Sequence, residues 1–303
     1  MNPTDPVVGV EWLMERLKSG DGASRLFIFD VRFELSAPHA GREAYLRGHI
    51  PGAVYLDLER DLSGPVGAHG GRHPLPDIGR LAETLRQYGV RRDSVLVFYD
   101  QGSAAYAARA WWLLTWLGHP AAHVLDGGFK AWLEAGGPVS TGDADERAAR
   151  SREHGDFRAE PQEGWIAGRD EVLQLSRALR SGARGAALVD ARAPERYRGE
   201  TEPIDRVAGH IPGAANCDYA QNFDPSGRWL SPAELRARYA AFEDLEDVVV
   251  YCGSGVSACA DILGMVRAGL RRPRLYPGSW SDWISHPDAP VARGDEASPA
   301  EPR

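Results

Sequence analysis

The chain of 303 residues is poor in sulfur, with three cysteines and three methionines. Cys217, Cys252 and Cys259 form no CxxC pair, and three thiols are too few for a disulfide framework. No structural zinc site is indicated either. We therefore expect reduced thiols, each of which needs its own explanation.

Long apolar runs and an excess of basic residues are also missing. No apolar run approaches the roughly 20 residues that span a bilayer. The formal net charge is −8 and the pI is near 5.6, which argues against a nucleic-acid partner. The first residues lack the basic and apolar segments of a secretory signal. We expect a soluble, cytoplasmic protein without a membrane or nucleic-acid partner.

The most informative feature that is present is an internal repeat. The first half contains LFIFDVR, RGHIPGAVYLD, SVLVFYDQG and HVLDGGFKAW, which begin at residues 26, 47, 94 and 123. The second half contains ALVDAR, AGHIPGAANCD, DVVVYCGSG and RLYPGSWSDW, which begin at residues 187, 208, 247 and 274. The six residues GHIPGA recur 161 positions apart inside flanks that also match. This pattern indicates a duplicated domain.

Each half predicts the same kind of sheet. Short β-branched runs at 95–99 and 248–251 do not alternate with polar residues, which is typical of strands buried on both faces. Helical patterns at 81–89, 104–118 and 257–269 separate such runs. Crossovers of this length require parallel pairing. We predict an α/β protein with two tandem domains, each a mainly parallel sheet flanked by helices.

The repeat also sets the expected domain boundaries. We expect a first domain at 1–140, a linker at 141–160, a second domain at 161–290 and a tail at 291–303. The linker is charged, poor in apolar residues and without clear periodicity, so an irregular surface segment is predicted there. The tail is predicted to be irregular as well.

Cys252 stands where the strand at 248–251 meets the following helix. Ligands of open α/β sheets bind at the carboxyl ends of strands, where helix N-termini favour anions. Gly253 and Gly255 allow the backbone to curl so that N–H groups converge on one point. Such a position lowers a thiol pKa from about 8.5 to roughly 3.5–7.5. We expect Cys252 to be a nucleophile, and Cys217 and Cys259 to be small core residues.

The repeated halves, the paired GHIPGA segments and the loop CGSGVSA resemble the two-domain rhodanese family of sulfurtransferases, over about residues 10–290. The loop is most similar to the 3-mercaptopyruvate sulfurtransferase branch, whose pattern is CGSGVT. The resemblance implies that sulfur is carried as a persulfide on Cys252, with no metal or organic cofactor. Asp100 aligns with Cys252, so the first domain is expected to be catalytically inactive. In the family, the active site lies between the two halves.

The same resemblance implies the other site residues. Two family arginines that bind the substrate correspond to Arg196 and Arg206, and a catalytic serine linked to a histidine and an aspartate corresponds to Ser254, His73 and Asp61. The substrate-binding loop corresponds to Gly253, Gly255, Val256 and Ser257. The first half is longer than the second: Gly52 to Asp100 spans 48 positions, and Gly213 to Cys252 spans 39. The extra residues fall around 61–76, a loop that could reach across to the second domain.

The residues around Cys252 are compatible with more than one function. Gly253 and Ser254 are neutral, which favours singly charged 3-mercaptopyruvate over thiosulfate as the sulfur donor. The products would be pyruvate and a sulfur-loaded acceptor, either a thiol such as thioredoxin or cyanide. Thiosulfate sulfurtransferase is the main alternative. A non-catalytic sulfur-carrier module is a weaker one. A Cdc25-like phosphatase is disfavoured, because no arginine lies between Cys252 and Arg267 to bind phosphate.

Overall fold

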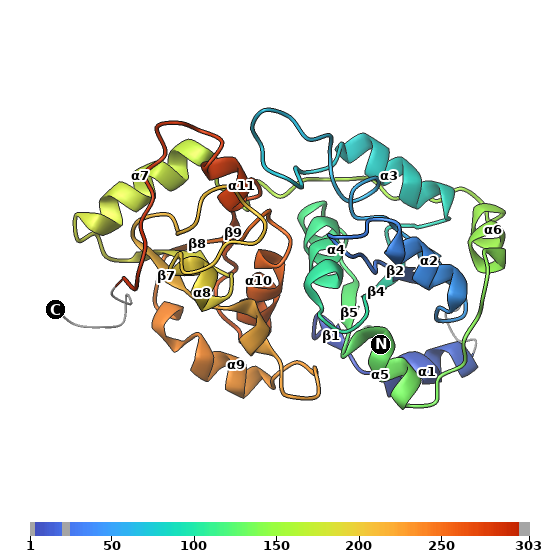
Figure 1. Ribbon diagram of the computed structural model, residues 1–303. Coiled ribbons are helices and arrows are strands. Elements are labelled where there is room, and N and C mark those ends of the chain that lie inside the picture. The colour runs from blue at the N-terminus through green and yellow to red at the C-terminus, as the bar shows by residue number, and fades with distance from the viewer. Residues whose placement is uncertain (1–3, 20–24, 297–303) are drawn as a thin grey trace. The chain divides into compact units, whose positions relative to one another are not determined.

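The computed structural model describes residues 4–19 and 25–296, and these residues form two compact units (Figure 1). The first unit contains the chain up to Gly64, Leu75–Gln162 and Pro225–Trp229. The second contains Pro65–Pro74, Glu163–Asp224 and the chain from Leu230 onward. The inserted loop of the first half thus contributes residues 65–74 to the second unit.

The first unit is built on a five-stranded sheet. Its strands are β1 (Val7–Val8), β2 (Leu26–Asp30), β3 (Ala53–Tyr55), β4 (Val95–Tyr99) and β5 (Ala122–Leu125). Their order is β1-β5-β4-β2-β3, and every pair is parallel, with Ile28 opposite Val97 on the central pair. The parallel arrangement predicted from the non-alternating apolar runs is confirmed.

Helices cover both faces of this sheet (Figure 1). They are α1 (Val10–Ser19), α2 (Ala40–Arg47), α3 (Ile78–Gln87), α4 (Ala105–Trp116), α5 (Gly128–Glu134) and α6 (Ala144–Arg150). Leu13 of α1 and Trp132 of α5 pack with Ile28 and Val97 in one apolar core. Helix α6 lies in the segment predicted to be irregular. Its sequence ADERAAR has too few apolar residues to show periodicity, yet Ala149 is buried.

The second unit repeats this plan with four strands. They are β6 (Ala186–Asp190), β7 (Ala214–Asn216), β8 (Asp247–Tyr251) and β9 (Arg274–Leu275), in the order β7-β6-β8-β9 and all parallel. Its helices are α7 (Arg169–Arg180), α8 (Pro194–Tyr197), α9 (Pro232–Arg238), α10 (Ala258–Arg267) and α11 (Ser279–Trp283), with 3₁₀ helices η1 (Tyr219–Asn222) and η2 (Ala240–Phe242). Across the described residues of both units, no helix combines the length and the apolar character needed to cross a membrane.

The GHIPGA motif plays the same packing role in each unit. Its histidine is fully buried and stacks on a tyrosine, with ring centroids 3.9 Å apart for Tyr45 and His49 and 3.8 Å apart for Tyr197 and His210. In both units the histidine Nδ1 also lies 2.8 Å from the carbonyl oxygen of that tyrosine. The most recognisable repeat in the sequence is therefore a structural element of each core.

Candidate functional site

Cys252 occupies the carboxyl end of β8, and its backbone is held on both sides. Its N–H donates to Ser279 Oγ at 3.1 Å, and its carbonyl accepts from the Trp280 N–H at 2.9 Å. Ser279 has φ of +54°, a conformation that residues with a side chain seldom adopt, and its hydroxyl donates to the Tyr276 carbonyl at 2.9 Å. Cys252 as a whole is only 1% exposed. The thiol thus sits on a rigid turn.

The two glycines after Cys252 serve different purposes. Gly255 has φ of +74°, and a Cβ there would lie 2.3 Å from the Pro277 carbonyl oxygen, so only glycine fits. A Cβ at Gly253 would lie 3.3 Å from Arg72 Nη2 and 3.8 Å from Arg196 Nη1. Gly253 therefore leaves space in front of two guanidinium groups.

The corresponding turn of the first unit holds a carboxylate through backbone hydrogen bonds. Strand β4 is followed by Asp100, whose carboxylate accepts backbone N–H groups from Gly102 at 2.8 Å, Ala104 at 3.0 Å, Tyr106 at 3.1 Å and Ala107 at 3.4 Å. Burial raises the pKa of Asp100, and these four donors oppose that rise. The position that aligns with Cys252 thus binds a negative group through converging amides.

His73 lies within hydrogen-bonding distance of Ser254, as the predicted pairing requires. The Nδ1 of His73 is 2.8 Å from Ser254 Oγ, and both residues are buried. His73 belongs to the segment 65–74 of the second unit, which packs closely at Gly71. There φ is +82°, and a Cβ would lie 2.4 Å from the Gly278 carbonyl oxygen. The chain therefore approaches α11 backbone to backbone just before His73.

A row of ion pairs positions the two arginines beside Gly253. Asp205 bridges them, with Oδ1 at 2.6 Å from Arg72 Nη1 and Oδ2 at 3.2 Å from Arg196 Nη2. Glu202 binds Arg196 at 2.7 Å and Arg192 at 3.3 Å. Burial works against ionisation of Glu202, but hydrogen bonds from Arg196 and from backbone N–H groups lower its pKa overall. Among the described contacts, Arg72 Nη2 and Arg196 Nη1 meet no protein acceptor.

Sequence reasoning missed Arg72. The available signal was its place next to His73 in the inserted loop, because a loop that brings one side chain to the site brings its neighbours as well. Arg206 was predicted to bind the substrate together with Arg196. The guanidinium of Arg206 donates from Nη2 to the Ile284 carbonyl.

Asp61 belongs to the first unit. Its carboxylate accepts the Asp57 N–H at 2.8 Å and pairs with Arg60 at 2.7 Å. These contacts hold its side chain in a turn of the first unit.

The remaining loop residues and thiols have structural partners. The carbonyls of Val256 and Ser257 accept N–H groups of Cys259 at 3.1 Å and Ala260 at 2.9 Å, which begins α10. All three cysteines are free thiols and buried. Burial raises the pKa of Cys217 to about 12, which favours the protonated thiol.

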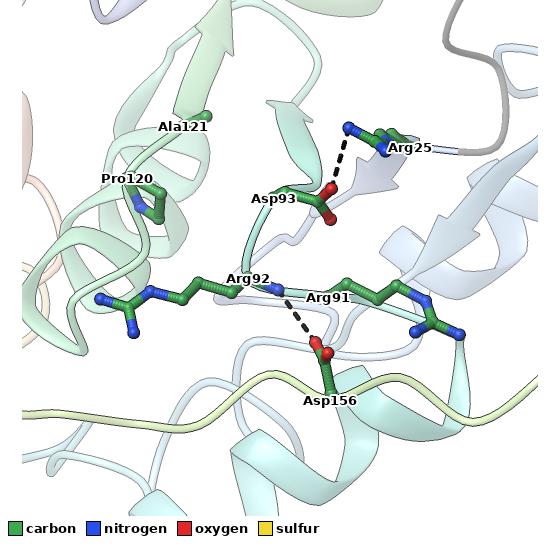
Figure 2. A pocket seen from close by; sticks show the side chains of 7 residues that line it. All are labelled: Arg25, Arg91, Arg92, Asp93, Pro120, Ala121 and Asp156. Atoms are coloured by element: carbon green, nitrogen blue, oxygen red, sulfur yellow. Dashed lines mark hydrogen bonds and ion pairs between the residues drawn. The ribbon is translucent and has the colours of Figure 1, made fainter.

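A cavity lies elsewhere, in the first unit (Figure 2). It has a volume of about 890 Å³ and is lined by Arg25, Arg91, Arg92, Asp93 and Asp156, among others. Its charges pair internally: Arg25 binds Asp93 at 2.9 Å, and the Arg92 N–H donates to Asp156 at 3.2 Å. It opens at the amino ends of β2 and β4, whereas ligands of α/β sheets bind at the carboxyl ends. We assign it no reaction.

Comparisons with known proteins agree with the duplicated fold. The family described as "Rhodanese-like domain" matches twice, over residues 9–135 and 172–286. A Pseudomonas aeruginosa protein with the name "Probable 3-mercaptopyruvate sulfurtransferase" is 46% identical over 275 residues, covering 89% of this chain and 93% of that protein. The thiosulfate sulfurtransferase of Cricetulus griseus is 31% identical over 299 residues, covering 95% of each.

A solved structure agrees as well. SseA of Escherichia coli, described as a 3-mercaptopyruvate sulfotransferase with the rhodanese fold, superposes with a TM-score of 0.75 at 29% identity. The match covers 92% of this chain and 100% of that one. These relatives share one activity, the transfer of sulfur from a small-molecule donor, and the matched segments span both units. The chain therefore belongs to the rhodanese family of sulfurtransferases.

Proposed function

We propose that this enzyme takes sulfur from 3-mercaptopyruvate, carries it as a persulfide on Cys252 and releases pyruvate. One observation carries the proposal: the guanidinium groups of Arg72 and Arg196 both face the space left by Gly253, next to the cysteine. A 2-oxo acid needs such donors for its carboxylate.

The charge balance of the site supports a singly charged donor. Glu202 and Asp205 cancel the formal charge of Arg72 and Arg196, so the site offers hydrogen-bond donors without a large net positive charge. Thiosulfate carries two charges and would gain most from uncompensated cations close to the cysteine. It remains the second candidate, favoured by the proximity of Arg72 to the loop.

The first step forms one bond and breaks one. The Cys252 thiolate attacks the sulfur of mercaptopyruvate, the carbon–sulfur bond breaks, and its electron pair passes to the pyruvate enolate. The main-chain amides of the loop would stabilise the sulfur anion, in the way that the four N–H groups hold the Asp100 carboxylate in the first unit.

Protonation of the enolate completes the first step. We assign the proton donor to Ser254, whose hydroxyl is 2.8 Å from His73 Nδ1. The imidazole can resupply the proton, and Asp61 is proposed to orient the imidazole. The backbone around Val256, Ser257 and Gly255 shapes the loop, and Arg72 takes the second arginine role in place of Arg206.

The second step regenerates the enzyme. An acceptor thiolate, such as that of thioredoxin, or cyanide attacks the outer sulfur of the persulfide, and Cys252 leaves as the thiolate. The acceptor departs as a persulfide or as thiocyanate. No metal or organic cofactor takes part in this scheme. The cytoplasm is the proposed compartment, because a reducing environment keeps free thiols such as these available.

Steady-state kinetics with the two donors tests the proposal. Purified protein should release pyruvate from mercaptopyruvate in the presence of a thiol, with kcat/KM higher than for thiosulfate. Cys252→Ser should release none, and p-nitrophenyl phosphate should remain intact. A clear preference for thiosulfate would overturn the donor assignment, and full pyruvate release by Cys252→Ser would overturn the mechanism.

A further inference from the structure

Three potential metal ligands meet at the end of α11, in a place that the sulfur chemistry does not use. His69, Asp282 and His286 each offer one ligand atom, and these atoms lie within 4.8 Å of one another. The two imidazole rings stack with centroids 4.1 Å apart, and His286 Nε2 is 3.4 Å from Asp282 Oδ1. Two imidazoles and a carboxylate form a donor set that suits zinc and similar transition metals.

The carboxylate of this cluster is already held in place. Asp282 is 5% exposed, its Oδ1 accepts the Gly70 N–H at 2.7 Å, and its Oδ2 accepts the Tyr276 hydroxyl. Metal-binding carboxylates in proteins are usually oriented by such outer hydrogen bonds. A buried carboxylate beside two imidazoles therefore costs little reorganisation when a cation arrives.

The hydrogen bonds around Ser285 determine which nitrogen of His69 is available. The Ser285 hydroxyl donates its single proton to the Asp282 carbonyl at 2.6 Å. Its oxygen must then accept from His69, whose Nδ1 lies 2.7 Å away. With the proton on Nδ1, the lone pair of the neutral ring is on Nε2. This is the tautomer that a metal-binding histidine adopts when a neighbouring group accepts from its other nitrogen.

We propose that His69, Asp282 and His286 bind one divalent transition-metal ion of the zinc class, with water completing the coordination. His69 is exposed and His286 half-buried, so the rings can tilt out of their stack to bring each nitrogen to about 2.0–2.1 Å from the ion. The ion would fasten residues 65–74, which include Arg72 and His73, to α11. This site is independent of the proposed sulfur donor.

Metal titration of the tag-free Cys252→Ser protein tests the proposal, because this variant removes the thiol that would otherwise compete for the metal. Isothermal titration with Zn²⁺ should give one saturable site per chain. Co²⁺ should give a visible spectrum without a thiolate charge-transfer band. Zn²⁺ should also slow amide exchange in residues 65–74.

Variants of the two histidines complete the test. His69→Asn and His286→Asn, each in the Cys252→Ser background, should weaken Zn²⁺ binding by about tenfold or more. The matched control is His39→Gln, which changes an exposed histidine of the first unit and should bind as the parent does. Circular dichroism checks that each variant is folded. Absence of saturable binding, a thiolate band, or unchanged affinity in both histidine variants would overturn the proposal.

Discussion

The turns after β4 and β8 share backbone hydrogen bonds but carry different side chains at their first position, Asp100 and Cys252. In each, the residue after the strand is buried and its carbonyl accepts an N–H from the helix opposite, Phe129 to Asp100 at 2.8 Å and Trp280 to Cys252 at 2.9 Å. In the first turn, the Asp100 carboxylate accepts four converging N–H groups. In the second, the thiol of Cys252 stands at the aligned position. We propose that this one side chain separates a structural turn from a reactive one.

The comparison extends to the residue that supports each turn. Gly128 stands in the first unit with φ of +59°, and a Cβ there would lie 2.5 Å from the Asp100 carbonyl oxygen. Ser279 stands at the aligned position of the second unit with φ of +54° and binds the Cys252 N–H. A left-handed conformation for a residue with a side chain costs about 1–3 kcal/mol. In the second unit, the strained residue brings a hydroxyl that accepts the N–H of the proposed nucleophile.

Replacing Cys252 with Asp makes the second turn a copy of the first and should have the largest effect. We expect Cys252→Asp to lose pyruvate release by roughly 10³-fold or more, because the nucleophile is gone. The protein should still fold, since the first unit accommodates a carboxylate at this place. Pyruvate release and thermal unfolding measure the two outcomes.

The reverse exchange is the control. Asp100→Cys should gain no sulfurtransfer in a Cys252→Ser background, because the arginines that would bind the donor flank the other turn. Turnover by the double variant would show that a cysteine in the turn after β4 is sufficient for sulfur transfer without the arginines, which contradicts this prediction.

A second comparison concerns the helices that follow. Nine residues after Asp100 and Cys252 respectively, α4 carries the buried Arg109 and α10 carries the buried Asp261. Burial raises the pKa of Asp261 from 3.8 to about 7, although the charge of Arg238 and hydrogen bonds from Tyr239 and Asn222 oppose the rise. Between pH 4 and 7 the unfolded chain releases this proton while the folded chain retains it. The stabilisation of the folded state by protonated Asp261 is therefore fully present below pH 4. It is lost as the pH rises to about 7, which lowers the free energy of unfolding by up to about 4 kcal/mol.

Chemical denaturation between pH 4 and 7 measures this loss. Asp261→Asn should show a smaller decrease in the free energy of unfolding over this range than the parent, because its amide does not titrate. Since other carboxylates titrate in both proteins, the difference between the two curves is the informative quantity. Parallel curves would show that Asp261 is ionised in the folded protein at pH 4.

The two arginine candidates can be separated by kinetics. Arg72→Ala should lower kcat/KM for mercaptopyruvate by roughly 100-fold, which corresponds to the loss of a charge-assisted hydrogen bond to the donor. Arg206→Ala should lower it less than about threefold, because its guanidinium is bound to the Ile284 carbonyl. A larger effect at Arg206 than at Arg72 would support the assignment of Arg206 made from sequence.

A smaller effect than that of Arg72→Ala is expected from the strained serine. Ser279→Gly removes the hydrogen bond to the Cys252 N–H but also relieves the left-handed strain. We expect kcat to fall by roughly tenfold while the free energy of unfolding changes by less than about 1 kcal/mol. A loss of stability with unchanged kcat would indicate that Ser279 serves the fold alone.

The parts of the molecule that sequence could predict are those encoded locally. The strand before Cys252, the turn glycines and the helix after it lie within one continuous stretch. The internal repeat predicted that the same arrangement occurs in two domains. The approach of His73 to Ser254 was anticipated through the family resemblance. Arg72 was missed because its position beside Gly253 depends on a loop contact about 180 residues away in sequence. Helix α6 was missed because it has little apolar character of its own.

The assignment of residues 65–74 to the second unit has an evolutionary consequence. A gene that arose by duplication can in principle lose one copy or exchange it for another. Here Arg72, which lies near Gly253, and His73, which contacts Ser254, are encoded in the first half of the chain, which contains no cysteine. Deleting the first half would remove both side chains, so the second half alone could not keep the proposed site.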